Sequence, residues 1–211
     1  MHAEAKKLRL GVLISGGGTN LQSILNAIEL GELDAQVAVV ISNRGDAYGL
    51  ERARLAGVPA VFLDPKGYAT LIDYNHALRE TLDEHGVEAV IMAGYMRLLG
   101  REVLEAFPSR VLNIHPALLP SFPGASGVAD AWKAGVKVTG VTVHFADEKF
   151  DEGPIIAQEV VRIEEDDTVA MVEARIHSVE HRIYPAAIQL LAQDRIRVEG
   201  RRVRVLPRGD A

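Results

Sequence analysis

The chain has 211 residues and a formal net charge of −6, from 23 Lys and Arg against 29 Asp and Glu. With 48% hydrophobic residues this is the composition of an ordinary globular protein. The sequence contains no apolar run of about eighteen residues, so it predicts no transmembrane helix. The absence of cysteine excludes disulfide scaffolds, thiolate zinc sites and cysteine nucleophiles. Net acidity disfavours nucleic-acid binding, because phosphate contacts need clustered Lys and Arg. The N-terminus lacks signal-peptide features, so we expect a cytoplasmic protein that binds neither nucleic acid nor membrane.

Apolar runs alternate with helical patterns through the first half of the chain. We expect strands at 8–15, 36–42, 60–63 and 88–93, and helices at 19–30, 48–56 and 68–85. Thr19, with Gln22 three positions later, predicts a capping box at the start of the first helix. Continuous apolar strands separated by helices predict a doubly wound, mostly parallel α/β sheet with helices on both faces.

The second half of the chain has a different sequence pattern and contains a proline-rich loop. We expect a strand at 110–115, the loop at 116–127, a helix at 128–134, strands at 138–145 and 154–163, a helix at 168–192 and a hairpin at 195–206. The hairpin carries five arginines between 195 and 204, a pattern typical of a solvated edge strand. No repeat or linker divides the chain, so we expect one compact domain.

A glycine-rich turn joins the first expected strand to the first expected helix. Backbone N–H groups of such a turn and of a helix N-terminus point at a bound anion, so we predict one phosphate at Gly18, Thr19 and Asn20. The dinucleotide fingerprint fits poorly, because its third glycine would fall at Leu21. Arg44 nevertheless leaves an NADP site open, and a tight turn without any ligand is a further alternative.

Two polar side chains share one face of the strand expected at 110–115. Asn113 and His115 are two residues apart near its C-terminal end, where open α/β sheets bind ligands. An amide beside an imidazole suits a developing oxyanion, and a protonated imidazole can also deliver a proton. A carboxylate near His115 would hold the imidazolium and raise its pKa, and both Asp147 and Asp151 are candidates.

A His-x-x-Glu-His pattern at 177–181 matches the inverted zinc-protease motif. Helical spacing places His177 and His181 on one face, but a third ligand would have to come from an Arg-rich remainder. We therefore expect no metal site there, and a helix face on which Glu180 contacts a ligand.

Several segments together resemble the phosphoribosylglycinamide formyltransferase family. The resemblance runs from about residue 8 to 190 and rests on residues 14–22, 41–43, 93–97, 113–120, 143–145 and 151–155. The Asn-Ile-His-Pro segment with its following Leu-Leu-Pro is specific for folate-dependent formyltransferases. The Gly-Thr-Asn-Leu-Gln turn and the Glu180-His181 pair point to the purine enzyme within that class.

The resemblance implies formyl transfer from 10-formyltetrahydrofolate to the amine of phosphoribosylglycinamide, without a metal. Its catalytic trio corresponds to Asn113, His115 and Asp151, which favours Asp151 over Asp147. The ribonucleotide's 5′-phosphate would bind Gly18, Thr19 and Asn20, and its ribose hydroxyls Glu180, with His177, Ser178 and Val179 along the same edge. The folate would contact Met96, Arg97, Leu98, Leu99, Leu104, Val111, Asn113 and the segment from Asp147 to Asp151. The single domain 1–211 would comprise a phosphate-binding half at 1–100, a catalytic and folate-binding half at 101–195, and a tail at 196–211.

Two positions depart from the family pattern, and three other functions compete with it. Ser126 stands where the family often has a histidine, and Leu71 where some members have a folate-contacting arginine.

A formyltransferase acting on initiator tRNA is expected to carry a further basic domain, and a hydrolase that deformylates the same folate is expected to carry a further N-terminal domain. A nucleotide-sensing module would leave the trio without a role. We expect small-molecule substrates and a monomer or homodimer.

Overall fold

The computed structural model of the chain describes residues 6–149 and 151–208. The first five residues of the charged N-terminus and the last three of the expected tail lie outside this range. The strands are β1 (Leu8–Ile14), β2 (Ala35–Ser42), β3 (Ala60–Phe62), β4 (Ala89–Met92), β5 (Val111–His115), β6 (Val138–Phe145), β7 (Ile155–Arg162), β8 (Ile196–Glu199) and β9 (Arg202–Val205). The helices are α1 (Thr19–Glu29), α2 (Tyr48–Leu55), α3 (Leu71–Glu84), α4 (Arg101–Leu104), α5 (Gly127–Lys133) and α6 (Val169–Ala192), with a short 3-10 turn at Pro65–Gly67.

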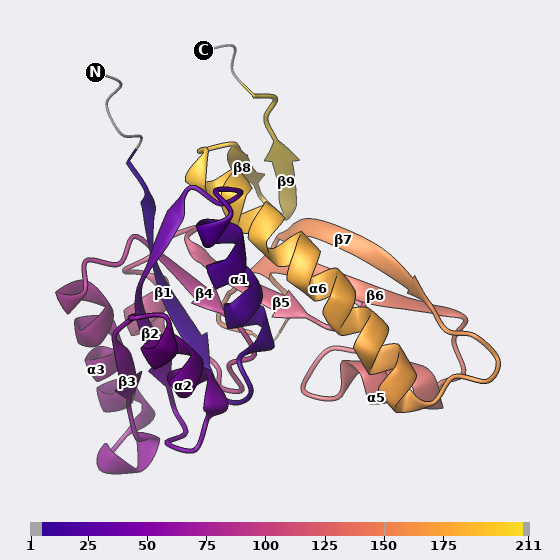
Figure 1. Cartoon of the computed structure of the whole chain (residues 1–211), viewed down its shortest axis with the longest axis horizontal. Helices are drawn as coiled ribbons and strands as arrows, with labels where there is room; N and C mark the ends of the chain where they lie inside the picture. The colour runs from indigo at the N-terminus through magenta and orange to yellow at the C-terminus, as the bar shows by residue number, and fades with distance from the viewer. Residues whose placement is uncertain (1–5, 150, 209–211) are drawn as a thin grey trace.

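A seven-stranded sheet in the order β3-β2-β1-β4-β5-β6-β7 forms the centre of the molecule (Figure 1). The pairs from β3 to β5 are parallel, and β6 and β7 add antiparallel pairs at one edge. The doubly wound, mostly parallel prediction is therefore confirmed. The strands β8 and β9 form the expected hairpin as a separate two-stranded sheet.

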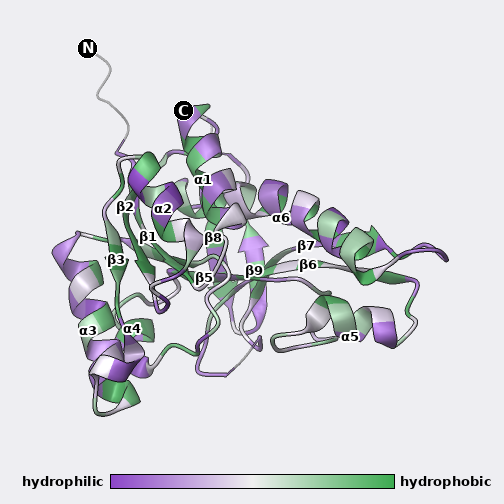
Figure 2. Cartoon of the chain, turned by 60° about the horizontal axis from the view of Figure 1, so that its bottom comes forward, coloured by the Kyte–Doolittle hydropathy of each residue, from purple (hydrophilic) through white to green (hydrophobic). Residues whose placement is uncertain are grey.

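Helices cover both faces of the sheet because successive strand residues point to opposite sides. In β1, Val12 and Ile14 pack in the cluster that contains α1, α2 and α6, whereas Leu13 packs in the cluster that contains α3 and α4. Hydrophobic residues accordingly concentrate on the central strands and on the helix faces against them (Figure 2). Within the described residues, no helix is long and apolar enough to cross a membrane.

The capping and boundaries of some helices differ from the sequence predictions. The capping box at Thr19 is wrong: the N-cap is Gly18 at φ 72°, and no side chain caps α1, because the glycine turn leads directly into helical backbone at Thr19. Helix α3 begins at Leu71 rather than at 68, because Thr70 and Asp73 form a reciprocal capping box there. The short helix α4 was not expected from the sequence.

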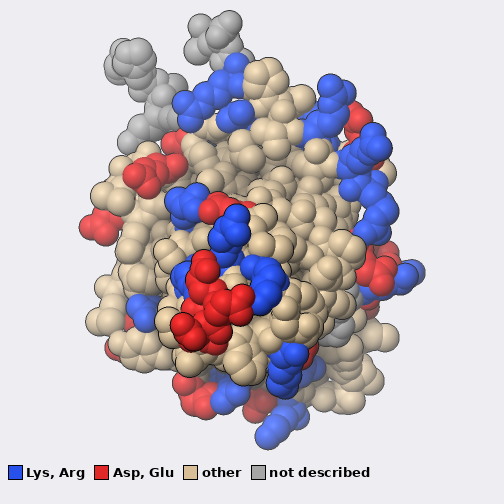
Figure 3. Space-filling model, turned by 90° about the vertical axis from the view of Figure 1, so that its right-hand side faces the viewer, with Lys and Arg blue, Asp and Glu red and all other residues tan. Residues whose placement is uncertain are grey.

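One face of the molecule, at the right-hand side of Figure 1, carries acidic and basic side chains intermixed (Figure 3). Among the ion pairs of the chain, Arg175 pairs with the buried Asp167, and Lys137 lies 2.9 Å from a carboxylate oxygen of Glu165. Exposed pairs such as Lys137–Glu165 contribute little to stability.

Candidate active site

A cavity of about 610 Å³ opens at the C-terminal ends of the parallel strands β1, β4 and β5. Open α/β sheets bind ligands at the C-terminal ends of their strands, at the point where the strand order reverses. In this sheet that point lies between β1 and β4. Residues 16–20, 92–96, 113–116 and 124–125 line it, together with Asp151, His177 and Glu180. The two regions that the sequence singled out, the glycine turn and the end of β5, thus face one space.

The side chains of Asn113, His115 and Asp151 meet at one end of this cavity. β5 places the first two on one face, as expected, and the loop between β6 and β7 brings in the third. The Asn113 amide nitrogen lies 3.4 Å from Asp151 Oδ1, and His115 Nδ1 lies 3.4 Å from Asp151 Oδ2. The side chains of His115 and Asp151 are only 4% and 6% exposed, so the pair lies in a weakly screened environment.

Asp151 adopts a backbone conformation that is uncommon for any residue except glycine. Its φ is 58°, in the left-handed region, and the Gly124 N–H donates to its Oδ2 at 2.8 Å. Asp147 instead accepts a hydrogen bond from the Lys149 N–H at 3.0 Å and does not line the cavity. The fold therefore brings Asp151, and not Asp147, to His115.

The charge state of the His115–Asp151 pair differs from the expectation. Burial lowers the pKa of His115, although the Asp151 carboxylate and the Phe122 carbonyl, which accepts from His115 Nε2 at 2.7 Å, favour the protonated ring. Asp151 does raise the pKa of His115 by charge pairing, as expected, but the net pKa lies below its ordinary value because desolvation outweighs the charge pairing. Burial raises the pKa of Asp151, but His144, the Gly124 N–H and His115 hold it below its usual value. The pair at neutral pH is thus a neutral imidazole beside a carboxylate.

His144 belongs to the same cluster and was not predicted as a site residue. It is 1% exposed and pairs with Asn113 across the antiparallel β5–β6 register. Its Nδ1 lies 2.8 Å from the Phe145 carbonyl, and its Nε2 lies 3.1 Å from the Asn113 amide nitrogen. Nδ1 therefore donates to that carbonyl, and the Nε2 edge of the ring faces both the Asn113 amide and Asp151 Oδ1, which lies 3.6 Å away. Only the antiparallel register, which the sequence does not state, could have revealed this contact.

The other end of the cavity is formed by the glycine turn and α6. Gly18 has a φ of 72°, and a Cβ atom there would lie 2.7 Å from the Gly49 Cα, so only glycine fits. Asn20 donates to a carboxylate oxygen of Glu180 at 3.1 Å, and both side chains are buried. Burial raises the pKa of Glu180, and the buried Asn20 Oδ1 has no hydrogen-bond partner among the residues that the structure describes. This end thus offers backbone N–H groups beside hydrogen-bonding side chains.

The Formyl transferase family model matches residues 8–188 of the chain. The chain belongs to the formyltransferase family. It is 42% identical over 183 residues to a phosphoribosylglycinamide formyltransferase of Bacillus subtilis, covering 87% of this chain and 94% of that protein. The crystal structure of glycinamide ribonucleotide transformylase 1 from Symbiobacterium toebii superposes with a TM-score of 0.96 at 53% identity, covering 98% of each chain. A formyltetrahydrofolate deformylase from Pseudomonas syringae matches with a TM-score of 0.88 at 28% identity, covering 97% of this chain and 67% of that chain.

Some residues that the family resemblance singled out do not line the cavity of about 610 Å³ at the strand ends, called the main cavity below. These are Arg97, Leu98, Leu99, Leu104, Val111, Asp147, Ser178 and Val179. Leu104 and Val111 line a separate cavity of about 130 Å³, and Leu99 is buried among residues of the α3 side of the core. On α6 only His177 and Glu180, three residues apart, face the main cavity, because intervening helical positions point elsewhere.

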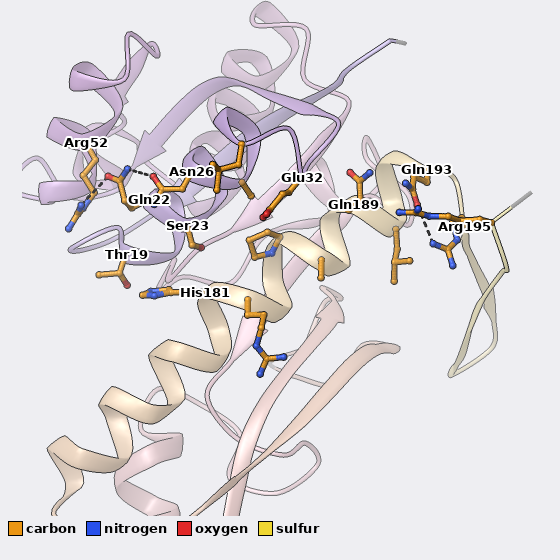
Figure 4. A pocket seen from close by; sticks show the side chains of 17 residues that line it. Thr19, Gln22, Ser23, Asn26, Glu32, Arg52, His181, Gln189, Gln193 and Arg195 are labelled. Carbon is orange, nitrogen blue, oxygen red and sulfur yellow. Dashed lines mark hydrogen bonds between the residues drawn. The ribbon is translucent and has the colours of Figure 1, made fainter. Parts of the chain in front are cut away.

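The sequence also raised two other ligand sites, an NADP site at Arg44 and a metal site at His177 and His181. Arg44 pairs with Asp46 at 2.8 Å and does not line the main cavity, so its charge is already neutralised beside the turn. His177 and His181 stack with ring centroids 6.3 Å apart, and among the described residues no three His, Asp or Glu side chains gather as a metal site. His181 instead faces a hollow of about 780 Å³ between α1 and α6, which adjoins the glycine turn at Thr19 (Figure 4).

Proposed function

We propose that this chain transfers the formyl group of 10-formyltetrahydrofolate to the amine of 5-phosphoribosylglycinamide. The products are formylglycinamide ribonucleotide and tetrahydrofolate, and the reaction belongs to purine biosynthesis. One observation carries the proposal: a single cavity joins the trio at β5 to the glycine turn and Glu180. A formyl-transfer centre and a phosphate-ribose site therefore open into the same space. We place the enzyme in the cytoplasm, as a monomer or homodimer that needs no metal.

The ribonucleotide occupies the end of the cavity at the glycine turn. Its 5′-phosphate accepts hydrogen bonds from the backbone N–H groups of Gly18, Thr19 and Asn20, where the positive end of the α1 dipole favours an anion. Glu180 accepts from the ribose hydroxyls, and the unpartnered Asn20 Oδ1 beside it offers a further acceptor. His177 closes the same edge. This placement directs the glycinamide amine towards Asn113.

The folate donor enters from the side of Met96, which lines the cavity and is 58% exposed. Its pterin lies along the Met96–Leu99 backbone and the segment up to Asp151. Leu104 and Val111, which border the separate smaller cavity, are the further folate contacts that the family resemblance implies. Arg97, whose guanidinium lies 5.3 Å from the centre of the Tyr74 ring, flanks the entrance with a positive charge.

Catalysis begins when the glycinamide amine attacks the formyl carbon and forms a carbon–nitrogen bond. The formyl oxygen becomes an oxyanion that accepts hydrogen bonds from the Asn113 amide and from His115 Nε2. The formyl oxygen replaces the Phe122 carbonyl that now accepts from Nε2. The developing negative charge raises the pKa of His115 and strengthens the hydrogen bond that its Nε2–H already donates, so the ring stabilises the oxyanion without taking the proton that the amine loses.

Asp151 completes the proton transfers. Its low pKa keeps it ionised, so it accepts the proton that the attacking amine loses, through a bridging water. The same proton passes to the folate nitrogen as the bond between that nitrogen and the formyl carbon breaks. His144 takes part by positioning both the Asn113 amide and the Asp151 carboxylate, which lie 3.1 Å and 3.6 Å from its Nε2.

Hydrolysis of the formylfolate is the second candidate function, favoured by the structural likeness to a deformylase. Water would then take the place of the amine, and the buried Asn20–Glu180 pair would have no ligand. The decisive assay follows tetrahydrofolate release from 10-formyltetrahydrofolate with and without phosphoribosylglycinamide. Release that depends on the ribonucleotide and yields its formylated product supports the transferase. Equal release without the ribonucleotide would refute it in favour of the hydrolase.

A further inference from the structure

The ends of three adjacent strands meet at one buried side chain, Ser15. The residue follows β1 and is 7% exposed, and its N–H donates to the Gly94 carbonyl at 3.1 Å. Its hydroxyl oxygen accepts from the Met96 N–H at 2.9 Å and donates to Asn43 Oδ1 at 2.6 Å. Gly94 and Met96 follow β4, Asn43 follows β2, and these strands flank β1 on its two sides.

Ser15 also leads directly into the glycine turn. The Gly16 carbonyl accepts from the Gly49 N–H at 3.0 Å, and the Gly17 carbonyl accepts from Arg52 Nε at 2.8 Å. These contacts fix the far side of the turn to α2, so Ser15 is its hydrogen-bonded link to the loop after β4. A shift of either loop therefore strains the hydrogen bonds of Ser15.

We propose that Ser15 is a positioning residue that couples the ribonucleotide site to the folate site. The identity of the two ligands rests on the proposed function. Binding of a phosphate orders the turn that follows Ser15, and binding of a pterin orders the loop that contains Met96. Because Ser15 precedes the turn directly and its hydroxyl accepts from the Met96 N–H, either ligand prepares the site of the other, and the coupling is reciprocal.

The test measures how strongly the ribonucleotide tightens folate binding. Tetrahydrofolate serves as the probe, because it carries no formyl group and the ternary complex cannot react. We expect saturating phosphoribosylglycinamide to lower the Kd of tetrahydrofolate about tenfold in the unmodified protein. In Ser15→Ala the Met96 N–H loses its buried acceptor, and we expect the coupling to fall to about twofold or less.

Ser42→Ala is the matched control. Ser42 is fully buried at the end of the neighbouring β2, and its hydroxyl donates to the Arg44 carbonyl and accepts from the Arg44 N–H. That pair of bonds closes one local turn and joins no second loop, so we expect Ser42→Ala to retain the coupling. Asn43→Ala removes only the acceptor of the Ser15 hydroxyl, and we expect it to lose part of the coupling.

Three outcomes would overturn the inference: no coupling in the unmodified protein, full coupling in Ser15→Ala, or equal loss in Ser42→Ala. Asn43→Ala decides the matter if Ser15→Ala fails to fold, and full coupling in that variant also counts against Ser15. Failure of the proposed function appears differently, as an unmodified protein that does not bind phosphoribosylglycinamide at all, whether or not it binds tetrahydrofolate.

Discussion

Gly18 offers the sharpest test of the phosphate end of the site. The chain turns there from β1 into α1 at a φ of 72°, and an added Cβ would lie 2.7 Å from the Gly49 Cα. The obstacle is backbone, so it cannot move aside as a flexible side chain would. Gly18→Ala must therefore displace the turn whose N–H groups are proposed to hold the phosphate.

The structure also supplies a matched control for the magnitude. Gly31 has nearly the same φ, 73°, but a Cβ there meets nothing within 4 Å. Gly31→Ala carries only the cost of left-handed backbone, about 1 kcal/mol. Gly18→Ala adds the backbone overlap, about 1–3 kcal/mol, so we expect it to lower the free energy of unfolding by about 2–4 kcal/mol in total.

The assay combines denaturant unfolding with titration of each ligand. A turn displaced by a fraction of an ångström should weaken phosphoribosylglycinamide binding at least about tenfold in Gly18→Ala. Tetrahydrofolate binding measured alone should change less than about threefold, and Gly31→Ala should leave both affinities unchanged. The reasoning is refuted if Gly18→Ala binds the ribonucleotide normally, or if both ligands weaken equally.

Three other predictions concern the trio, the buried histidine and metal. We expect kcat to fall about 100- to 1,000-fold in each of Asn113→Ala, His115→Ala and Asp151→Ala. The double variant of His115 and Asp151 should lose less kcat than the product of the two single losses. Normal turnover in Asp151→Ala would contradict the proposed trio. Because burial lowers the pKa of His115 from 6.5, the unfolded chain takes up the proton first, so unfolding free energy should decline as pH falls below about 6.5. His115→Gln should reduce that slope, and parallel profiles would argue against it. Activity should survive exhaustive chelation, whereas zinc bound tightly at His177 and His181 would contradict the metal-free mechanism.

The sheet was predictable because the central parallel strands β1 and β4 are buried on both faces and read as continuous apolar runs. Val12, Leu13 and Ile14 illustrate this, since consecutive residues enter two different core clusters. Helix boundaries that depend on side-chain capping were harder to predict from the sequence. Thr19 fits a capping box in sequence, yet the preceding glycine at φ 72° already completes the turn. Backbone torsion outweighed the side-chain pattern there.

Asn113 and His115 could be paired from strand periodicity alone, because residues two apart share a face. Their partners depend on register and loop shape instead. His144 reaches Asn113 only through the antiparallel β5–β6 pairing, and Asp151 reaches His115 only because its φ of 58° turns the carboxylate inward. Neither property leaves a local mark in the sequence, and from spacing alone Asp147 stood equal to Asp151.

The protonation of His115 shows why proximity of charges is not enough to assign a catalytic role. A carboxylate 3.4 Å away favours the imidazolium, but the same burial that makes this attraction strong also penalises the charged ring, and the penalty is larger. The resting site therefore holds a neutral donor, and its hydrogen bond strengthens when an oxyanion forms beside it. Such a donor interacts more strongly with the intermediate than with the formyl group of the substrate. That difference, rather than a permanently charged histidine, is what lowers the barrier.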